Sequence, residues 1–201
     1  STFYGGSAIE VANYIATDGQ GNVFVTGGTS SANFPIKNAG TFFQPYTGGG
    51  IFILKFDNAG TLNWATFYGK GGAGNSIAID GNNNVYITGV TDSSNFPVAG
   101  STIFQPIAGG GKDAFILKFD NAGNRLWATY YGGSKDDIGA AIAADGSGNV
   151  FVAGSTGSGN FPVPPAGTYF QNPFGGVTDA FILKFDKLGN RLWATCYGGG
   201  G

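Results

Sequence analysis

One unit of sequence occurs three times in this chain of 201 residues, and this repeat limits the possible folds more than any other feature. Four motifs recur in the same order in every copy, and the motif Trp-Ala-Thr returns at spacings of 63 and 66 residues. A fixed period of this kind is typical of architectures whose units bury their apolar faces against one another. The motifs are Asp-Gly-x-x-Asn (from Asp18, Asp80 and Asp145), Asn-Phe-Pro (Asn33, Asn95 and Asn160), Phe-Ile-Leu-Lys-Phe-Asp (Phe52, Phe115 and Phe181) and Trp-Ala-Thr (Trp64, Trp127 and Trp193).

Each copy is predicted to form four short β-strands. In the second copy they cover residues 77–79, 85–89, 115–119 and 125–131. These segments are rich in β-branched and aromatic residues and are bounded by Gly and Asn, as strands are. The Asp-Gly-x-x-Asn motif supplies residues that tolerate a positive φ, which a tight hairpin requires. The glycine content, 38 of 201 residues, indicates many turns rather than long helices.

Both faces of the predicted sheets are apolar. Along the third strand Phe115 and Leu117 share one face, while Ile116 lies on the other. On the fourth strand Trp127 lies opposite to its apolar neighbour Leu126. A sheet that is apolar on both faces must lie between two others, as the blades of a propeller do. We therefore predict an all-β fold, a β-propeller-type array of three four-stranded antiparallel blades.

The repeats divide the chain into three blades, at residues 7–68, 69–131 and 132–201, while residues 1–6 match part of the outer strand of a preceding or neighbouring blade. A long loop, such as residues 94–112, connects strands two and three of each blade. Because Asn-Phe-Pro and Phe-Gln recur within it, we expect this loop to pack on itself, with its aromatic rings against the blade edge. The Phe-Gln pairs are Phe43-Gln44, Phe104-Gln105 and Phe170-Gln171.

Composition excludes several classes of function. The net charge is −2 and Lys and Arg form no run, so a nucleic-acid partner is not expected. No apolar stretch approaches the roughly 18 residues of a transmembrane helix. The chain has no histidine and only one glutamate, Glu10, which removes histidine-based catalysis and histidine metal sites. The acidic pair Asp136-Asp137 occurs in one copy only. We expect no catalytic residue and no cofactor other than calcium.

Calcium is the one metal that the sequence offers a place for. The loops that begin at Asp80 and Asp145 hold hard oxygen ligands, but they lack the further carboxylates of an EF-hand. A turn aspartate more often accepts hydrogen bonds from its own backbone, and this structural interpretation is favoured. The candidate calcium ligands are Asp80, Asn82, Asn84, Asp145 and Asn149.

The ordered motifs resemble those of the bacterial and archaeal SBBP family, whose repeats are named for seven-bladed β-propellers. The resemblance is carried by Gly148–Thr156, Asp113–Phe119 and Trp127–Gly133, together with Asn-Phe-Pro and Phe-Gln, and it covers nearly the whole chain. It implies a propeller fold in large secreted or surface-attached proteins and no catalytic residues. The first copy departs from the pattern because Asp-Ala does not precede Phe52, as it does the equivalent Phe115 of the second copy.

Three blades are too few to close a propeller, which needs about four to eight. We expect the open ends to meet further repeats of a longer chain, a second copy in a six-bladed ring, or successive copies in a fibre. The start at Ser1 without Met fits a processed protein or a fragment. The candidate assembly residues are Thr2, Phe3, Tyr4, Trp193, Cys196 and Tyr197.

These observations predict a non-enzymatic structural or adhesive protein, extracellular or on the cell surface of a bacterium or archaeon. Its expected partner is itself or further repeats. The alternative is a lectin-like propeller that binds glycans, with Trp64, Trp127 and Trp193 available to stack on sugar rings. We favour packing of these rings between blades. For the single cysteine, Cys196, a buried thiol is favoured over an interchain disulfide.

Overall fold

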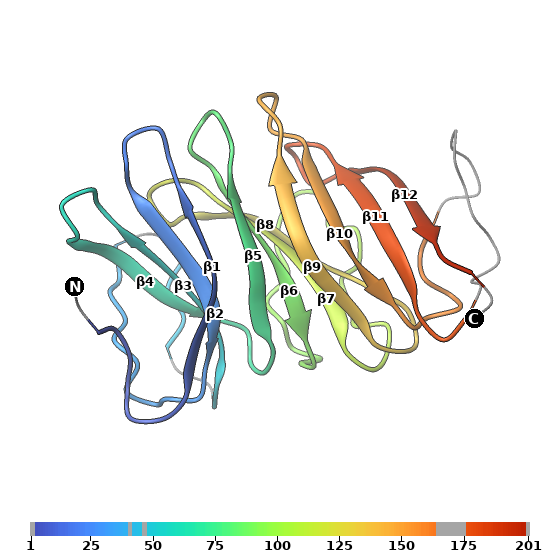
Figure 1. Cartoon of the computed structure of the whole chain (residues 1–201), viewed down its shortest axis with the longest axis horizontal. Coiled ribbons are helices and arrows are strands. Elements are labelled where there is room, and N and C mark those ends of the chain that lie inside the picture. The colour runs from blue at the N-terminus through green and yellow to red at the C-terminus, as the bar shows by residue number, and fades with distance from the viewer. Residues whose placement is uncertain (1–2, 40–41, 46–47, 164–175, 200–201) are drawn as a thin grey trace.

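A computed structural model describes residues 3–39, 42–45, 48–163 and 176–199. It consists of three four-stranded antiparallel sheets that lie side by side in chain order (Figure 1), which confirms the predicted fold class. No helix in these described ranges is long and apolar enough to cross a membrane. The strands are β1 (Glu10–Thr17), β2 (Val23–Thr29), β3 (Gly50–Phe56), β4 (Leu62–Tyr68), β5 (Ala73–Ile79), β6 (Val85–Thr91), β7 (Asp113–Phe119), β8 (Arg125–Tyr131), β9 (Asp137–Ala144), β10 (Val150–Thr156), β11 (Asp179–Phe185) and β12 (Arg191–Tyr197).

Each sheet is one blade, and its strands are paired in the order in which they occur in the chain. We call β1–β4 blade 1, β5–β8 blade 2 and β9–β12 blade 3. The boundary between two successive blades is named by their numbers. Because all the pairings are antiparallel neighbours, every blade forms from contacts within about one repeat length.

Aspartate turns close the hairpins. In the β5–β6 turn, Asp80 Oδ1 accepts hydrogen bonds from the backbone N–H groups of Asn82 and Asn84, at 2.8 and 2.9 Å. The residue before the final Asn of this turn has a positive φ, 62° at Asn83 and 79° at both Gly21 and Gly148. The predicted turn chemistry is confirmed.

Two apolar cores lie between the blades, and a smaller cluster lies on the outward side of blade 1. One core joins blade 1 to blade 2, and a second joins blade 2 to blade 3. Strand β7 contributes to both, because Phe115 and Leu117 face blade 1 while Ala114 and Ile116 face blade 3. All seven residues of β7 are buried, as expected for a sheet covered on both faces.

The long loops pack on the blades. The phenylalanines of the three Asn-Phe-Pro motifs are buried, and Lys37 and Ala99 form bridges to the outer strands at Ala65 and Ala128. The Phe-Gln motif is less regular than its sequence suggests. In blade 1 it is Phe42, not the predicted Phe43, that packs on Tyr68 and Phe119. Phe170-Gln171 lies outside the described residues.

Candidate functional site

The outward face of blade 3 is the candidate interaction surface. Its residues are exposed, whereas their counterparts on blade 2 are covered by the next blade. Ile182 is 42% exposed against 0% for Ile116, and Trp193 is 37% exposed against 3% for Trp127. Tyr197, at 63%, repeats the difference. We call Ile182, Trp193 and Tyr197 the open face of blade 3. These three side chains are therefore exposed where the equivalent side chains of blade 2 are covered.

Blade 1 presents the opposite kind of face. At the boundary between blades 2 and 3, a set of apolar side chains of blade 3 faces blade 2. Blade 1 carries the equivalent side chains on its outward side. This similarity means that the two ends of the array are complementary in kind. The corresponding pairs are Phe181 and Phe52, Leu183 and Leu54, Phe185 and Phe56, Phe161 and Phe34, Val152 and Val25, and Ile142 and Ile15.

Tyr4 already occupies part of the blade 1 face. Its ring packs edge-on against Phe34 at 5.3 Å, and its hydroxyl donates to the carbonyl of Pro35. At the boundary between blades 2 and 3, Tyr131 makes the same two contacts, with Phe161 and with the carbonyl of Pro162. Tyr4 therefore takes the place that the last tyrosine of a preceding blade takes elsewhere. Residues 3–6 form no strand.

The other predicted assembly residues are placed differently. Phe3 is exposed. Cys196 points away from the open face into the core with blade 2, where it is 4% exposed. Burial, with Asp179 and Asp137 nearby, raises the pKa of this thiol to about 11. Thr2 lies outside the described residues.

The aspartates of the predicted calcium loops accept hydrogen bonds from nearby groups of the protein. Asp80 Oδ2 accepts hydrogen bonds from Asn84 Nδ2 at 2.8 Å and from the Tyr86 hydroxyl at 3.0 Å. Asp145 accepts the matching bonds from Asn149. These bonds hold the pKa of both carboxyl groups below the usual range, although burial opposes the shift at Asp80. In the described part of the chain no three His, Cys, Asp or Glu side chains lie close enough to hold a metal. Asn82 offers only its backbone N–H to this network.

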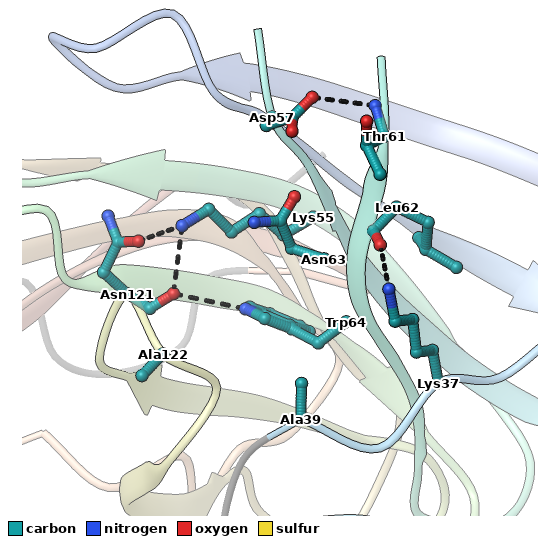
Figure 2. Close-up of a pocket in the computed structure, with 10 residues that line it drawn as sticks. All are labelled: Lys37, Ala39, Lys55, Asp57, Thr61, Leu62, Asn63, Trp64, Asn121 and Ala122. Carbon is teal, nitrogen blue, oxygen red and sulfur yellow. Dashed lines mark hydrogen bonds between the residues drawn. The ribbon is translucent and has the colours of Figure 1, made fainter. Parts of the chain in front are cut away.

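A pocket of about 620 Å³ lies where the β7–β8 turn of blade 2 meets blade 1 (Figure 2). Asn121 anchors this turn, because its carbonyl accepts hydrogen bonds from Trp64 Nε1 at 3.2 Å and from Lys55 Nζ at 3.3 Å. Burial lowers the pKa of Lys55, and the charge of Asp18 opposes that shift. Asn63 Oδ1 is buried here without a hydrogen-bond partner.

Sequence reasoning missed a group of buried acids at the blade boundaries. Asp113 and Asp137 are almost fully buried. The position of Asp137 is not peculiar to one copy, because Glu10 of blade 1 pairs with Thr29 as Asp137 pairs with Thr156. Strand register, rather than motif spacing, reveals this correspondence.

Comparison with known proteins agrees with the blade architecture. An uncharacterized WD repeat-containing protein, L264, of Acanthamoeba polyphaga mimivirus is 30% identical over 72% of this chain. The regulatory protein FlaEY of Caulobacter vibrioides is 28% identical over 73% of it. The chain spans only 12% and 15% of the lengths of these two relatives.

The SBBP beta-propeller repeat family matches the chain three times, over residues 4–35, 63–97 and 126–162. Each match ends at or beside an Asn-Phe-Pro motif, so the three matches are in phase with the structural repeat. Together they cover more than half of the chain, which therefore belongs to the SBBP beta-propeller repeat family.

Proposed function

We propose that this chain is a non-enzymatic structural module that works by stacking blades, and that a second copy docks its blade 1 on the open face of blade 3. The carrying observation is the exposure of Ile182, Trp193 and Tyr197, whose counterparts are buried at the internal boundaries. Apolar area of this kind is normally covered. We also propose an extracellular or cell-surface location, supported by the sparse charge and the Gly- and Asn-rich surface.

A second copy is a suitable occupant because the outward side of blade 1 repeats the side that blade 3 presents to blade 2. A head-to-tail contact of this type closes into a ring or continues into a fibre, depending on its rotation. Docking requires one exchange. Tyr197 of the receiving copy takes the place on Phe34 of the arriving copy that Tyr4 occupies, so residues 3–6 of the arriving copy must leave it.

Light scattering of the purified chain over a range of concentrations tests this proposal. We expect particles of at least twice the 20.5 kDa chain mass. The double variant Ile182→Ser/Trp193→Ser should be monomeric. Leu192→Asn is the matched control, because Leu192 and its counterpart Leu126 are both exposed and blade 1 has Asn63 there.

Two outcomes contradict the proposal. One is a wild-type chain that stays monomeric at the highest concentration. The other is assembly that survives in the double variant. A Tyr4→Ser variant tests the displacement of Tyr4 by itself. Because this variant leaves the place on Phe34 empty, it should assemble more strongly. Weaker assembly would mean that Tyr4 itself supports the contact.

Glycan binding is a second candidate, and it is supported by the pocket in Figure 2. Lys37 and Asp57 line it, and the Asn63 oxygen without a partner could accept a sugar hydroxyl. The ring of Trp64 is buried, so stacking on its face is not available. A glycan array with the wild-type chain and Asn63→Leu tests this function. Leucine is the residue that blades 2 and 3 carry at this position. Absence of hits, or equal hits with both proteins, removes it.

A further inference from the structure

Two aspartates meet at the boundary between blades 2 and 3. Asp113 begins β7 and Asp137 begins β9, and they are 1% and 0% exposed. A β-carbon on Gly132 would overlap Asp113 Oδ1 and would lie 2.8 Å from Asp137 Oδ2. Both carboxylates therefore converge on the space beside a residue that has no side chain. The Asp137 N–H donates to the Lys112 carbonyl at 2.7 Å, which ties the two strand starts together.

Each of these carboxylates has one oxygen without a hydrogen-bond partner. Asp113 Oδ2 accepts a bond from the Gly109 N–H at 2.9 Å, and Asp137 Oδ2 accepts bonds from the Gly133 N–H at 2.6 Å and the Ser158 hydroxyl at 2.8 Å. The Oδ1 atoms of both are buried without a hydrogen-bond partner, although the Thr156 hydroxyl is close enough to the Asp137 carboxylate to oppose the rise of its pKa. Such atoms are costly in a folded protein unless a ligand or proton satisfies them.

The boundary pair differs in kind from the turn aspartates. Both oxygens of Asp145 receive donors from their own loop, and its pKa is lowered. Burial and, to a smaller extent, the charge of Asp137 raise the pKa of Asp113 to about 6, against the opposing effect of the backbone donors. The pKa of Asp137 is also raised, chiefly by burial. Burial of a carboxylate without a compensating cation explains both directions, and a neighbouring like charge adds to each, Asp137 at Asp113 and Asp136 at Asp137.

The residue types at these two positions change together from one blade boundary to the next. Between blades 1 and 2, the corresponding positions are both glycine, Gly50 and Gly72. At the two ends of the array, Asp179 takes the place of Asp113 and Glu10 takes the place of Asp137. Paired acids at one boundary and paired glycines at the other indicate that the two positions act as one unit.

We propose that Asp113 and Asp137 bind a divalent cation, Ca²⁺ by preference, which joins blade 2 to blade 3. Ca²⁺ takes carboxylate, carbonyl and water oxygens at about 2.3–2.6 Å in flexible geometry, and two convergent carboxylates suit it. The carbonyl oxygens of Gly132 and Gly133 lie beside Gly109, whose N–H donates to Asp113 Oδ2. A bound ion in the space beside Gly132 supplies the missing partner of Asp113 Oδ1, lies beside Asp137 Oδ2 and neutralises the pair.

Thermal unfolding of the whole chain at neutral pH, in EDTA and in millimolar CaCl₂, tests this site. Ca²⁺ at about a hundred times its Kd should raise the Tm of the wild type by about 5 °C or more. Asp113→Asn should abolish this rise. Asp145→Asn, which alters only a turn loop, should retain it.

Terbium luminescence gives a direct readout, because Tb³⁺ replaces Ca²⁺ at oxygen sites and is excited through a nearby tyrosine. Tyr130 is the expected antenna, since the charge of Asp113 contributes to its raised pKa. We expect one Tb³⁺ per chain, displaced by Ca²⁺ and lost in Asp113→Asn.

Three outcomes overturn the proposal. If Ca²⁺ leaves the wild-type Tm unchanged while Asp113→Asn raises it in EDTA, the pair shares a proton instead of an ion. If the Ca²⁺ response survives Asp113→Asn but disappears in Asp145→Asn, the ion binds at the turn. If Asp137→Asn retains full Tb³⁺ binding, the two acids do not form one site.

Discussion

Strands β7 and β11 have the same sequence, Asp-Ala-Phe-Ile-Leu-Lys-Phe, and different surroundings. Every residue of β7 is buried, because blade 1 covers one face and blade 3 the other. In β11 the residues that face blade 2 are buried, and Ala180 and Ile182 on the other face are exposed. The comparison teaches that the strand sequence specifies the blade, while the neighbouring blade determines how much of it is buried.

Polar contacts reinforce the covered boundary between blades 2 and 3. The Arg191 guanidinium donates to the Tyr131 hydroxyl at 3.1 Å and to the Pro162 carbonyl at 2.6 Å, and it lies over the ring of Phe104. Lys118 Nζ and Trp127 Nε1 both donate to the Lys187 carbonyl. All of these contacts except the bond within blade 3 from Arg191 to Pro162 span two blades, so this boundary combines an apolar core with directional bonds.

The largest expected effect separates the two environments of the repeated tryptophan. Trp127→Ala should lower the free energy of unfolding by about 3–5 kcal/mol, because it opens a cavity between two blades. Trp193→Ala should cost the unassembled chain only about 1 kcal/mol, because Trp193 is already partly exposed. Urea unfolding at a concentration where the chain is monomeric measures both. Equal losses would mean that contacts with blade 3 add nothing to the stability that Trp127 provides.

The next effect concerns the contacts that Arg191 makes with Tyr131 and Pro162. Arg191→Leu should cost about 1.5–3 kcal/mol, because it removes charge-assisted bonds to Tyr131 and Pro162. Leucine is a fair replacement, since blade 1 has Leu62 at this position, where the structure describes no covering blade. Arg191→Lys should recover little, because an ammonium group cannot make the same forked contact. Full recovery of the free energy of unfolding with lysine would mean that only the positive charge of Arg191 matters.

The pH dependence of stability sharpens the contrast between boundary and turn acids. The pKa of Asp113 is raised to about 6 in the folded chain, so this group adds stability below its unfolded pKa of about 3.9, and that stability is lost as pH rises through about 6. The loss should be on the order of 2 kcal/mol in EDTA. Asp113→Asn should remove this slope in urea unfolding measured from acid to neutral pH.

Asp145 is the control for that measurement. Its pKa is lowered by hydrogen bonds from Asn149, so its contribution is present above its unfolded pKa and is lost as pH falls. Asp145→Asn should therefore leave the slope near pH 6 intact. A slope that is identical in all three proteins would assign it to other groups.

The smallest expected effect lies on the open face itself. Ile182→Ser should change the stability of the monomeric chain by about 0.5 kcal/mol or less, as exposed substitutions do. The same change at Ile116 should cost several times more, because it buries a hydroxyl between two blades. Urea unfolding of the two variants side by side provides the test. A large loss from Ile182→Ser would show that this face is covered even at low concentration.

Local features of the fold were predictable because they depend on contacts within a few residues. Strand positions, the aspartate turns and the apolar character of both faces follow from alternation and turn chemistry. The use of Phe42 rather than Phe43 was not predictable, because adjacent phenylalanines both satisfy the motif and only packing on Tyr68 and Phe119 distinguishes them.

The candidate sites were less predictable than the fold. The sequence marked Trp193, Cys196 and Tyr197 as assembly candidates, but it did not indicate that Cys196 faces the opposite way. Asp113 and Asp137 are 24 residues apart in different blades, and no local pattern brings them together. Their meeting depends on how blade 2 and blade 3 stack.

The sequence by itself determined that this protein is built from three copies of one four-stranded unit, because periodicity and turn chemistry are local properties. Only the tertiary structure decided which copies of the same side chain are buried and which carboxylates converge. The physical reason is that burial and electrostatic coupling depend on the neighbouring blade, whose position is not encoded within any single repeat.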